Sequence, residues 1–150
     1  MRLRDVGRFA CRAPVLFMKK TEKEMSWIDE VHFNEEGLVP VIVQDDETHR
    51  VLMFAWANKE ALEETVATGR GVYFSRSRGQ VWCKGKSSGN EQRVLGMQLD
   101  TDGKAVLYLV DQQGGVACHT GHASCFWREL GSGGWREAEP VVRAPEDMYR

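Results

Sequence analysis

The sequence predicts one β-rich α+β domain with a mixed or antiparallel sheet and few helices. Runs of apolar, β-branched and aromatic residues of strand length recur from residue 38 onward and alternate with polar turns. One stretch, between Asn58 and Gly69, combines helical spacing with a start signal and a stop signal. With 150 residues, of which 42% are hydrophobic, the chain has room for a single domain with its own core.

The elements follow in order from the first hairpin. Apolar runs at 38–44 and 50–56 flank the polar turn 45–49, which is typical of a hairpin. Asn58 can cap the following helix, and Gly69 can end it in the left-handed conformation. The apolar positions of this helix are Ala61, Leu62 and Val66. We expect further strands at 71–75, 80–84, 93–99 and 105–111, and a short helix after Cys118.

The two ends of the chain read differently from its centre. Residues 1–24 are rich in arginine around a short apolar patch, which fits either an organelle presequence or an unstructured extension upstream of a natural start at Met25. The domain is expected to cover residues 25–130. Residues 131–150 begin with a glycine-rich break and continue as an acidic, proline-containing stretch, so we expect a loose tail.

Charge and cysteine usage exclude several classes of function. A net charge of −2 does not indicate a nucleic-acid or anionic-membrane partner, and no apolar run approaches the length of a membrane span. The chain lacks the apolar core of a secretory signal, so its four cysteines are not expected to form stable disulfides. We therefore expect a cytoplasmic protein whose clustered cysteines belong to a metal site or a reactive thiol.

Four possible metal ligands fall within eight residues: Cys118, His119, His122 and Cys125. Zinc prefers thiolate and imidazole, and a catalytic zinc needs three protein ligands with one position open for water. On a helix, Cys118, His122 and Cys125 would share one face. The alternative is a pair of buried structural thiols with two surface histidines, and spacing alone leaves both open.

Asp100 and Asp102 lie at the end of a predicted strand and point the same way if the chain there is extended. Such a pair can hold Mg²⁺ together with waters and substrate oxygens. The sequence Asp102-Gly103 is also the ordinary signal of a turn between two strands, and taken alone the turn is favoured.

A local cationic segment follows the third predicted strand. Arginine and lysine side chains bind phosphate, while serine hydroxyls and glycine-exposed amides complete a cradle. The candidate binding residues are Arg76, Arg78, Lys84, Ser87 and Ser88. The alternative is a solvated hairpin whose charges face water.

Over residues 27–128 the chain resembles the phosphoribosyl-AMP cyclohydrolase family of histidine biosynthesis. The order and spacing of the matching stretches are specific, although several are weak individually. They are Gly37-Leu38-Val39-Pro40, Val51-Leu52-Met53 with Ala55 and Asn58, Thr68-Gly69-Arg70, Ser75-Arg76-Ser77-Arg78, Trp82, Lys84-Gly85, Ser88-Gly89-Asn90, and Cys118-His119-Thr120-Gly121 with Ser124-Cys125-Phe126.

The resemblance implies a hydrolase that opens the adenine ring of phosphoribosyl-AMP at the N1–C6 bond. It also implies an intertwined homodimer with zinc at a site shared between subunits and Mg²⁺ nearby. Cys118 and Cys125 match zinc ligands of the family, Asp100 and Asp102 match magnesium ligands, and His119 matches a proton carrier. The phosphate-binding neighbourhood then includes Arg76, Arg78 and Lys84.

Two positions depart from the family pattern. Thr101 replaces a zinc cysteine, and Lys104 replaces a magnesium carboxylate. Another residue could supply the missing zinc ligand, with His122 preferred on spacing and Cys83 next. A second possibility is a paralogue that uses a different metal. A third is a catalytically impaired dimer that binds a phosphoribosyl nucleotide or has a regulatory role. We favour retained activity, because an exposed reactive thiol is otherwise a liability.

Overall fold

The computed structural model describes residues 26–149. In chain order the elements are η1 (Trp27–Glu30), β1 (Val39–Asp45), β2 (Val51–Ala57), α3 (Lys59–Thr68), β3 (Val72–Ser75), β4 (Gln80–Cys83), β5 (Gln92–Leu99), β6 (Val106–Gln112), η2 (Gln113–Gly115), β7 (Arg128–Gly131), β8 (Gly134–Glu137) and α4 (Pro145–Met148). All the predicted strands are present within a residue or two. The alternatives for residues 1–24 lie outside the described residues.

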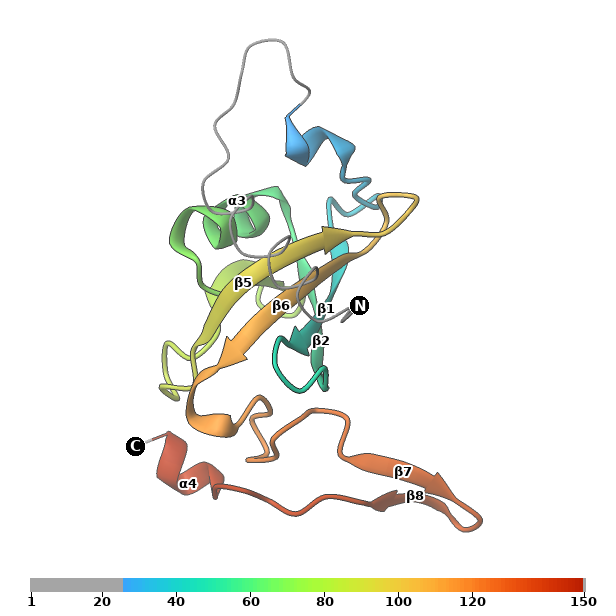
Figure 1. Cartoon of the computed structure of the whole chain (residues 1–150), viewed down its shortest axis with the longest axis vertical. Helices are drawn as coiled ribbons and strands as arrows, with labels where there is room; N and C mark the ends of the chain where they lie inside the picture. The colour runs from blue at the N-terminus through green and yellow to red at the C-terminus, as the bar shows by residue number, and fades with distance from the viewer. Residues whose placement is uncertain (1–25, 150) are drawn as a thin grey trace, which may run out of the picture.

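A four-stranded sheet in the order β2-β1-β6-β5 forms the centre of the fold (Figure 1). β1 pairs antiparallel with β2 and parallel with β6, and β6 pairs antiparallel with β5. The connection from β2 to β5 carries α3 and the small β3–β4 sheet. The predicted β-rich α+β domain with a mixed sheet is therefore confirmed.

The core lies on one face of this sheet because alternate residues of β1 point into it. Val39, Val41 and Val43 are fully buried, and Tyr108 of β6 is buried with them. The short strand β3 adds Tyr73, whose ring centre lies 5.6 Å from that of Tyr108. This packing fixes the ends of the strands, from which the functional loops project.

The helix α3 begins and ends as the sequence predicts. The Asn58 side chain accepts a hydrogen bond from the Ala61 amide at 2.8 Å, and Gly69 adopts a left-handed φ of 73°. The buried positions differ in one respect. Thr65 is fully buried and its hydroxyl bonds to the Ala61 carbonyl at 2.8 Å, whereas Val66 is only partly buried.

No helix forms after Cys118, contrary to the prediction. Residues 116–127 form a series of turns, which we call the cysteine loop. Gly121 has a φ of 89°, and a side chain there would meet the Arg143 carbonyl. Because a right-handed helix cannot pass through that conformation, the predicted helical face of Cys118, His122 and Cys125 does not exist.

The expected loose tail is ordered in the structure. β7 and β8 form a hairpin around the glycine-rich break, and residues 138–149 then run back to the body of the domain (Figure 1). Both the Val142 and Arg143 amides donate to the Gly121 carbonyl, at 2.9 and 3.2 Å. Met148 is buried against Asn90. Long-range contacts therefore order this segment, although its composition suggests disorder.

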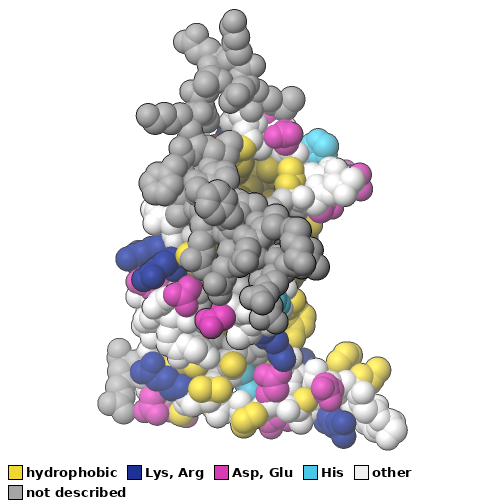
Figure 2. Space-filling model, viewed as in Figure 1, with side chains coloured by type: hydrophobic (Ala, Val, Ile, Leu, Met, Phe, Trp, Pro, Cys, Tyr) yellow, Lys and Arg dark blue, Asp and Glu magenta, His cyan; other side chains and the backbone are white. Residues whose placement is uncertain are grey.

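The β7–β8 hairpin extends away from the domain and exposes apolar side chains (Figure 2). Leu130 and Trp135 face each other across the two strands and are 69% and 68% exposed. Among residues 26–149, no helix is both long and apolar enough to cross a membrane.

Candidate active site

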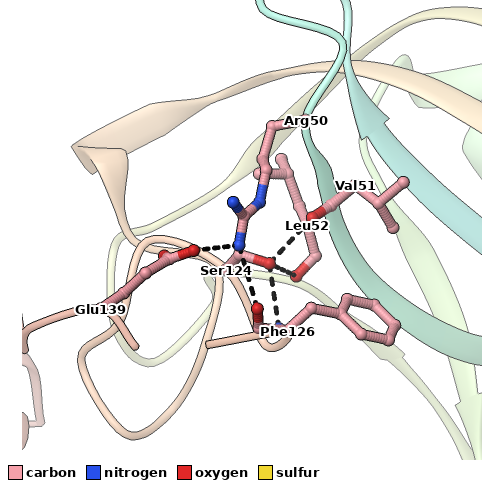
Figure 3. A network of polar contacts seen from close by, with 6 residues as sticks. All are labelled: Arg50, Val51, Leu52, Ser124, Phe126 and Glu139. Carbon is pink, nitrogen blue, oxygen red and sulfur yellow. Dashed lines mark hydrogen bonds and ion pairs between the residues drawn. The ribbon is translucent and has the colours of Figure 1, made fainter. Parts of the chain in front are cut away.

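Hydrogen bonds clamp the cysteine loop onto the start of β2 (Figure 3). The Cys125 amide donates to the Leu52 carbonyl at 2.7 Å, and the Ser124 hydroxyl donates to the Val51 carbonyl at 2.8 Å. Ser124 in turn accepts from the Phe126 amide at 3.0 Å. Because Ser124 is almost fully buried, these contacts fix the backbone on either side of Cys125.

Arg50, the residue before β2, strengthens this clamp. Its guanidinium donates to the Phe126 carbonyl at 3.0 Å and forms an ion pair with Glu139 of the tail (Figure 3). The same side chain therefore holds both the end of the cysteine loop and the segment that crosses it.

Cys118 and Cys125 form a thiol pair within this loop. Burial, together with the neighbouring Cys118, raises the pKa of Cys125 to about 12. Two thiols side by side match two positions of a soft metal ion. Within residues 26–149, however, no three histidine, cysteine or acidic side chains come together as a metal site. One chain therefore offers two ligands and no third.

A cavity of about 710 Å³ is lined by Arg78, Lys84 and Lys86 together with Glu60 and Glu64, and we call it the cationic cavity for its excess of basic side chains. It brings together four of the five predicted phosphate-binding residues: Arg78, Lys84, Ser87 and Ser88. Arg76 does not line this cavity, because its guanidinium carbon lies 4.8 Å above the ring centre of Trp56. Tyr149, from the tail, is an additional lining residue.

Lys84 lines the cavity and interacts electrostatically with the two thiols. Burial lowers the pKa of its amine, while the nearby Cys125 and Cys118 act in the opposite direction. The Lys84 amide donates to the Gly71 carbonyl at 2.9 Å, which anchors this residue to the start of β3.

The two histidines of the loop have different surroundings. His119 is exposed, next to Cys118 in the chain. His122 is 3% exposed, and both ring nitrogens have partners: Nδ1 lies 2.7 Å from the Thr120 hydroxyl and Nε2 lies 3.2 Å from the Glu137 carboxylate. Direct metal ligation by His122 would require one of these contacts to break.

Asp100 and Asp102 lie in the hairpin turn between β5 and β6, which we call the acidic turn (residues 100–103). Asp100 accepts from the Lys104 amide at 2.6 Å, and Gly103 has a φ of 72°, so the predicted turn is present. It lies at the opposite end of β6 from the cysteine loop (Figure 1). A seven-residue strand spans about 20 Å, so one chain does not bring the acidic turn to the thiols.

Cys83, the second candidate for a missing zinc ligand, lines the cationic cavity and is partly buried. Burial is the main cause that raises the pKa of its thiol.

Sequence reasoning missed Thr120, Trp127, Glu137 and Tyr149 as members of this region. Glu137 and Tyr149 escaped notice because the tail was expected to be loose. The sequence did hold a signal for the hairpin, since the glycine-rich turn 131–134 is flanked directly by the apolar residues Leu130 and Trp135.

Basic and hydroxyl side chains in one cavity suit an enzyme that binds a phosphorylated substrate, and two neighbouring thiols suit a soft metal ion. Comparison with known proteins agrees. The family model for phosphoribosyl-AMP cyclohydrolase matches residues 53–127. The chain is 50% identical to the phosphoribosyl-AMP cyclohydrolase of Nitrosococcus oceani over 125 residues, which cover 83% of this chain and 95% of the relative.

Two further relatives carry the same name. The proteins of Pseudomonas aeruginosa (strain LESB58) and Thioalkalivibrio sulfidiphilus are each 50% identical over 123 residues, or 82% of this chain and 92% and 94% of theirs. The chain belongs to the phosphoribosyl-AMP cyclohydrolase family. Its predicted family and its predicted class, a hydrolase, are thereby confirmed.

Proposed function

We propose that the chain hydrolyses the N1–C6 bond of the adenine ring of 1-(5-phosphoribosyl)-AMP. The observation that carries this proposal is the position of Lys84, which lines the cationic cavity and interacts electrostatically with Cys118 and Cys125. A substrate with a phosphate at each end can be anchored in the cavity while its purine ring reaches the thiol pair. Remote phosphate binding then positions the reacting carbon.

The side chains of the site take separate roles. Arg78, Lys84, Ser87 and Ser88 bind phosphate, and Arg76 joins them only if its stacking on Trp56 is released. Cys118 and Cys125 are the zinc ligands. A zinc ion held there would lower the pKa of a bound water and supply the nucleophile near neutral pH.

His119 is the proton carrier in this scheme. The oxygen of water forms a bond with C6 and the C6–N1 bond breaks. His119 carries one proton of the water to N1, the other goes to the exocyclic nitrogen on C6, and a carboxamide remains. The ring is opened, and no proton or electron is gained or lost overall. The exposure of His119 beside Cys118 leaves its imidazole accessible to a substrate.

A homodimer would complete the site. Because β6 separates Asp100 and Asp102 from Cys118 by about 20 Å, a site that uses all three must take the acidic turn from a second copy. Magnesium ligation by the two aspartates belongs to that dimer. Asp100 already accepts from the Lys104 amide, which supports a weakened magnesium site. A cytoplasmic location stays a prediction.

The test is an assay of metal-stripped protein on phosphoribosyl-AMP with zinc, manganese, iron or magnesium restored one at a time. Turnover that requires one of these ions, and that is lost on Cys118→Ser, is the expected result. Lys84→Gln should raise KM, and Lys59→Gln, on the exposed side of α3, is its matched control. Substrate binding without turnover under every metal would refute the proposal and favour the binding or regulatory dimer.

A further inference from the structure

A chain of hydrogen bonds leads from the tail hairpin to Cys118. The Glu137 carboxylate of β8 lies 3.2 Å from His122 Nε2, and His122 Nδ1 lies 2.7 Å from the Thr120 hydroxyl. Thr120 then donates to the Cys118 sulfur at 3.0 Å. Four residues from two elements are thus connected, and the chain ends on a predicted metal ligand.

His122 is held in place on every side. Its ring stacks on Trp127 with centroids 4.0 Å apart and an angle of 3° between the planes. It is 3% exposed, and the adjacent Gly121 carbonyl accepts two amides from the tail. The ring therefore cannot turn to another partner without breaking these contacts.

The bond from Thr120 to Cys118 determines where the other hydrogens of this hydrogen-bonded series lie. A threonine hydroxyl has one hydrogen, and that of Thr120 is directed at the Cys118 sulfur. The Thr120 oxygen then accepts from His122 Nδ1, and because the Glu137 carboxylate only accepts, Nε2 donates to it, so both ring nitrogens carry a hydrogen in this arrangement. His122 consequently sets the direction in which the Thr120 hydroxyl points.

We propose that His122 is a positioning residue and not a metal ligand: held by Glu137 and Trp127, it orients the Thr120 hydroxyl toward Cys118 and so fixes that sulfur for a soft divalent cation. This inference rests on the metal-dependent function proposed above. A hydrogen bond to a thiolate sulfur restricts its rotamers and stabilises its charge, as outer contacts do for other ligands. Through Glu137, the β7–β8 hairpin helps to hold His122 in place.

The experiment measures binding of Co²⁺ to the full chain by competition with a chelator, together with the thiolate-to-cobalt absorption band. His122→Phe keeps the ring stacked on Trp127 but removes both hydrogen bonds. Thr120→Val keeps the shape of the side chain but removes its hydroxyl. We expect each variant to bind Co²⁺ about 10–100-fold more weakly at unchanged stoichiometry, and Thr120→Ser to retain affinity.

The double variant separates positioning from ligation. If His122 acts through Thr120, His122→Phe causes no further loss in a Thr120→Val background. A further loss there, or a loss of bound metal stoichiometry, would identify His122 as a direct ligand and overturn the proposal. Unchanged affinity in both single variants would overturn it equally.

Surface variants keep the test free of unfolding. Glu137→Gln changes only the outermost member of the chain and should weaken Co²⁺ binding by a smaller factor than His122→Phe. Glu129→Gln is the matched control, because Glu129 lies on the same hairpin and pairs with Arg136. Metal binding is measured without substrate, so an inactive wild-type protein would refute the proposed hydrolysis and leave this result intact.

Discussion

Replacement of Gly121 by alanine should detach the tail from the cysteine loop. The glycine has a φ of 89°, and an added Cβ would meet the Arg143 carbonyl and lie 3.0 Å from the Val141 side chain. A left-handed alanine costs about 1–2 kcal/mol. The two amide bonds to the Gly121 carbonyl contribute about 0.5–1.5 kcal/mol each.

Together these losses lower the free energy of unfolding by about 2–5 kcal/mol. For a chain of this size the melting temperature should fall by about 5 °C or more. The assays are thermal unfolding and limited trypsin digestion, in which cleavage after Arg143 should accelerate. Gly133→Ala is the matched control, since nothing lies within 4 Å of its added Cβ. Equal melting temperatures and equal digestion rates for the two variants would refute the reasoning.

Three further predictions concern the site. Because its pKa is raised to about 12, Cys125 should be a neutral thiol at pH 8 in the metal-free protein. It should then react slowly with iodoacetamide at pH 8 and faster as the pH rises further, and fast alkylation at pH 8 would contradict this. Lys84→Gln should raise KM about 10–100-fold through loss of a charge-assisted hydrogen bond, while Lys59→Gln leaves KM unchanged. Because the pKa of Lys84 is lowered, the KM of the wild-type protein should begin to rise at a lower alkaline pH than an ordinary lysine would give. Mixing inactive Cys118→Ser and Asp102→Asn chains should restore up to about a quarter of wild-type activity if each site takes residues from two copies, and no recovery would place the site within one chain.

Local patterns predicted the fold well. Asn58 and Gly69 act within their own helix, and the alternation of β1 depends only on the pleat of a strand. The cationic cavity was equally accessible, because Lys84, Ser87 and Ser88 follow one another in a single loop.

The rest could not be predicted, because it depends on contacts between distant segments. The cysteine loop is not helical since Gly121 faces the tail, and the tail is ordered since Met148 packs on Asn90. Arg76 does not join the predicted phosphate-binding residues, because its guanidinium stacks on the ring of Trp56 from another strand.

The clamp on the cysteine loop has a consequence for folding. The bond from Ser124 to Val51 joins residues 73 positions apart, so the loop closes only after β2 has found its place in the sheet. Contacts of such high sequence separation form late. During that interval Cys118 and Cys125 remain open to oxidants. The yield of active protein on refolding should therefore depend on the reductant present, even though the finished sheet contains neither cysteine.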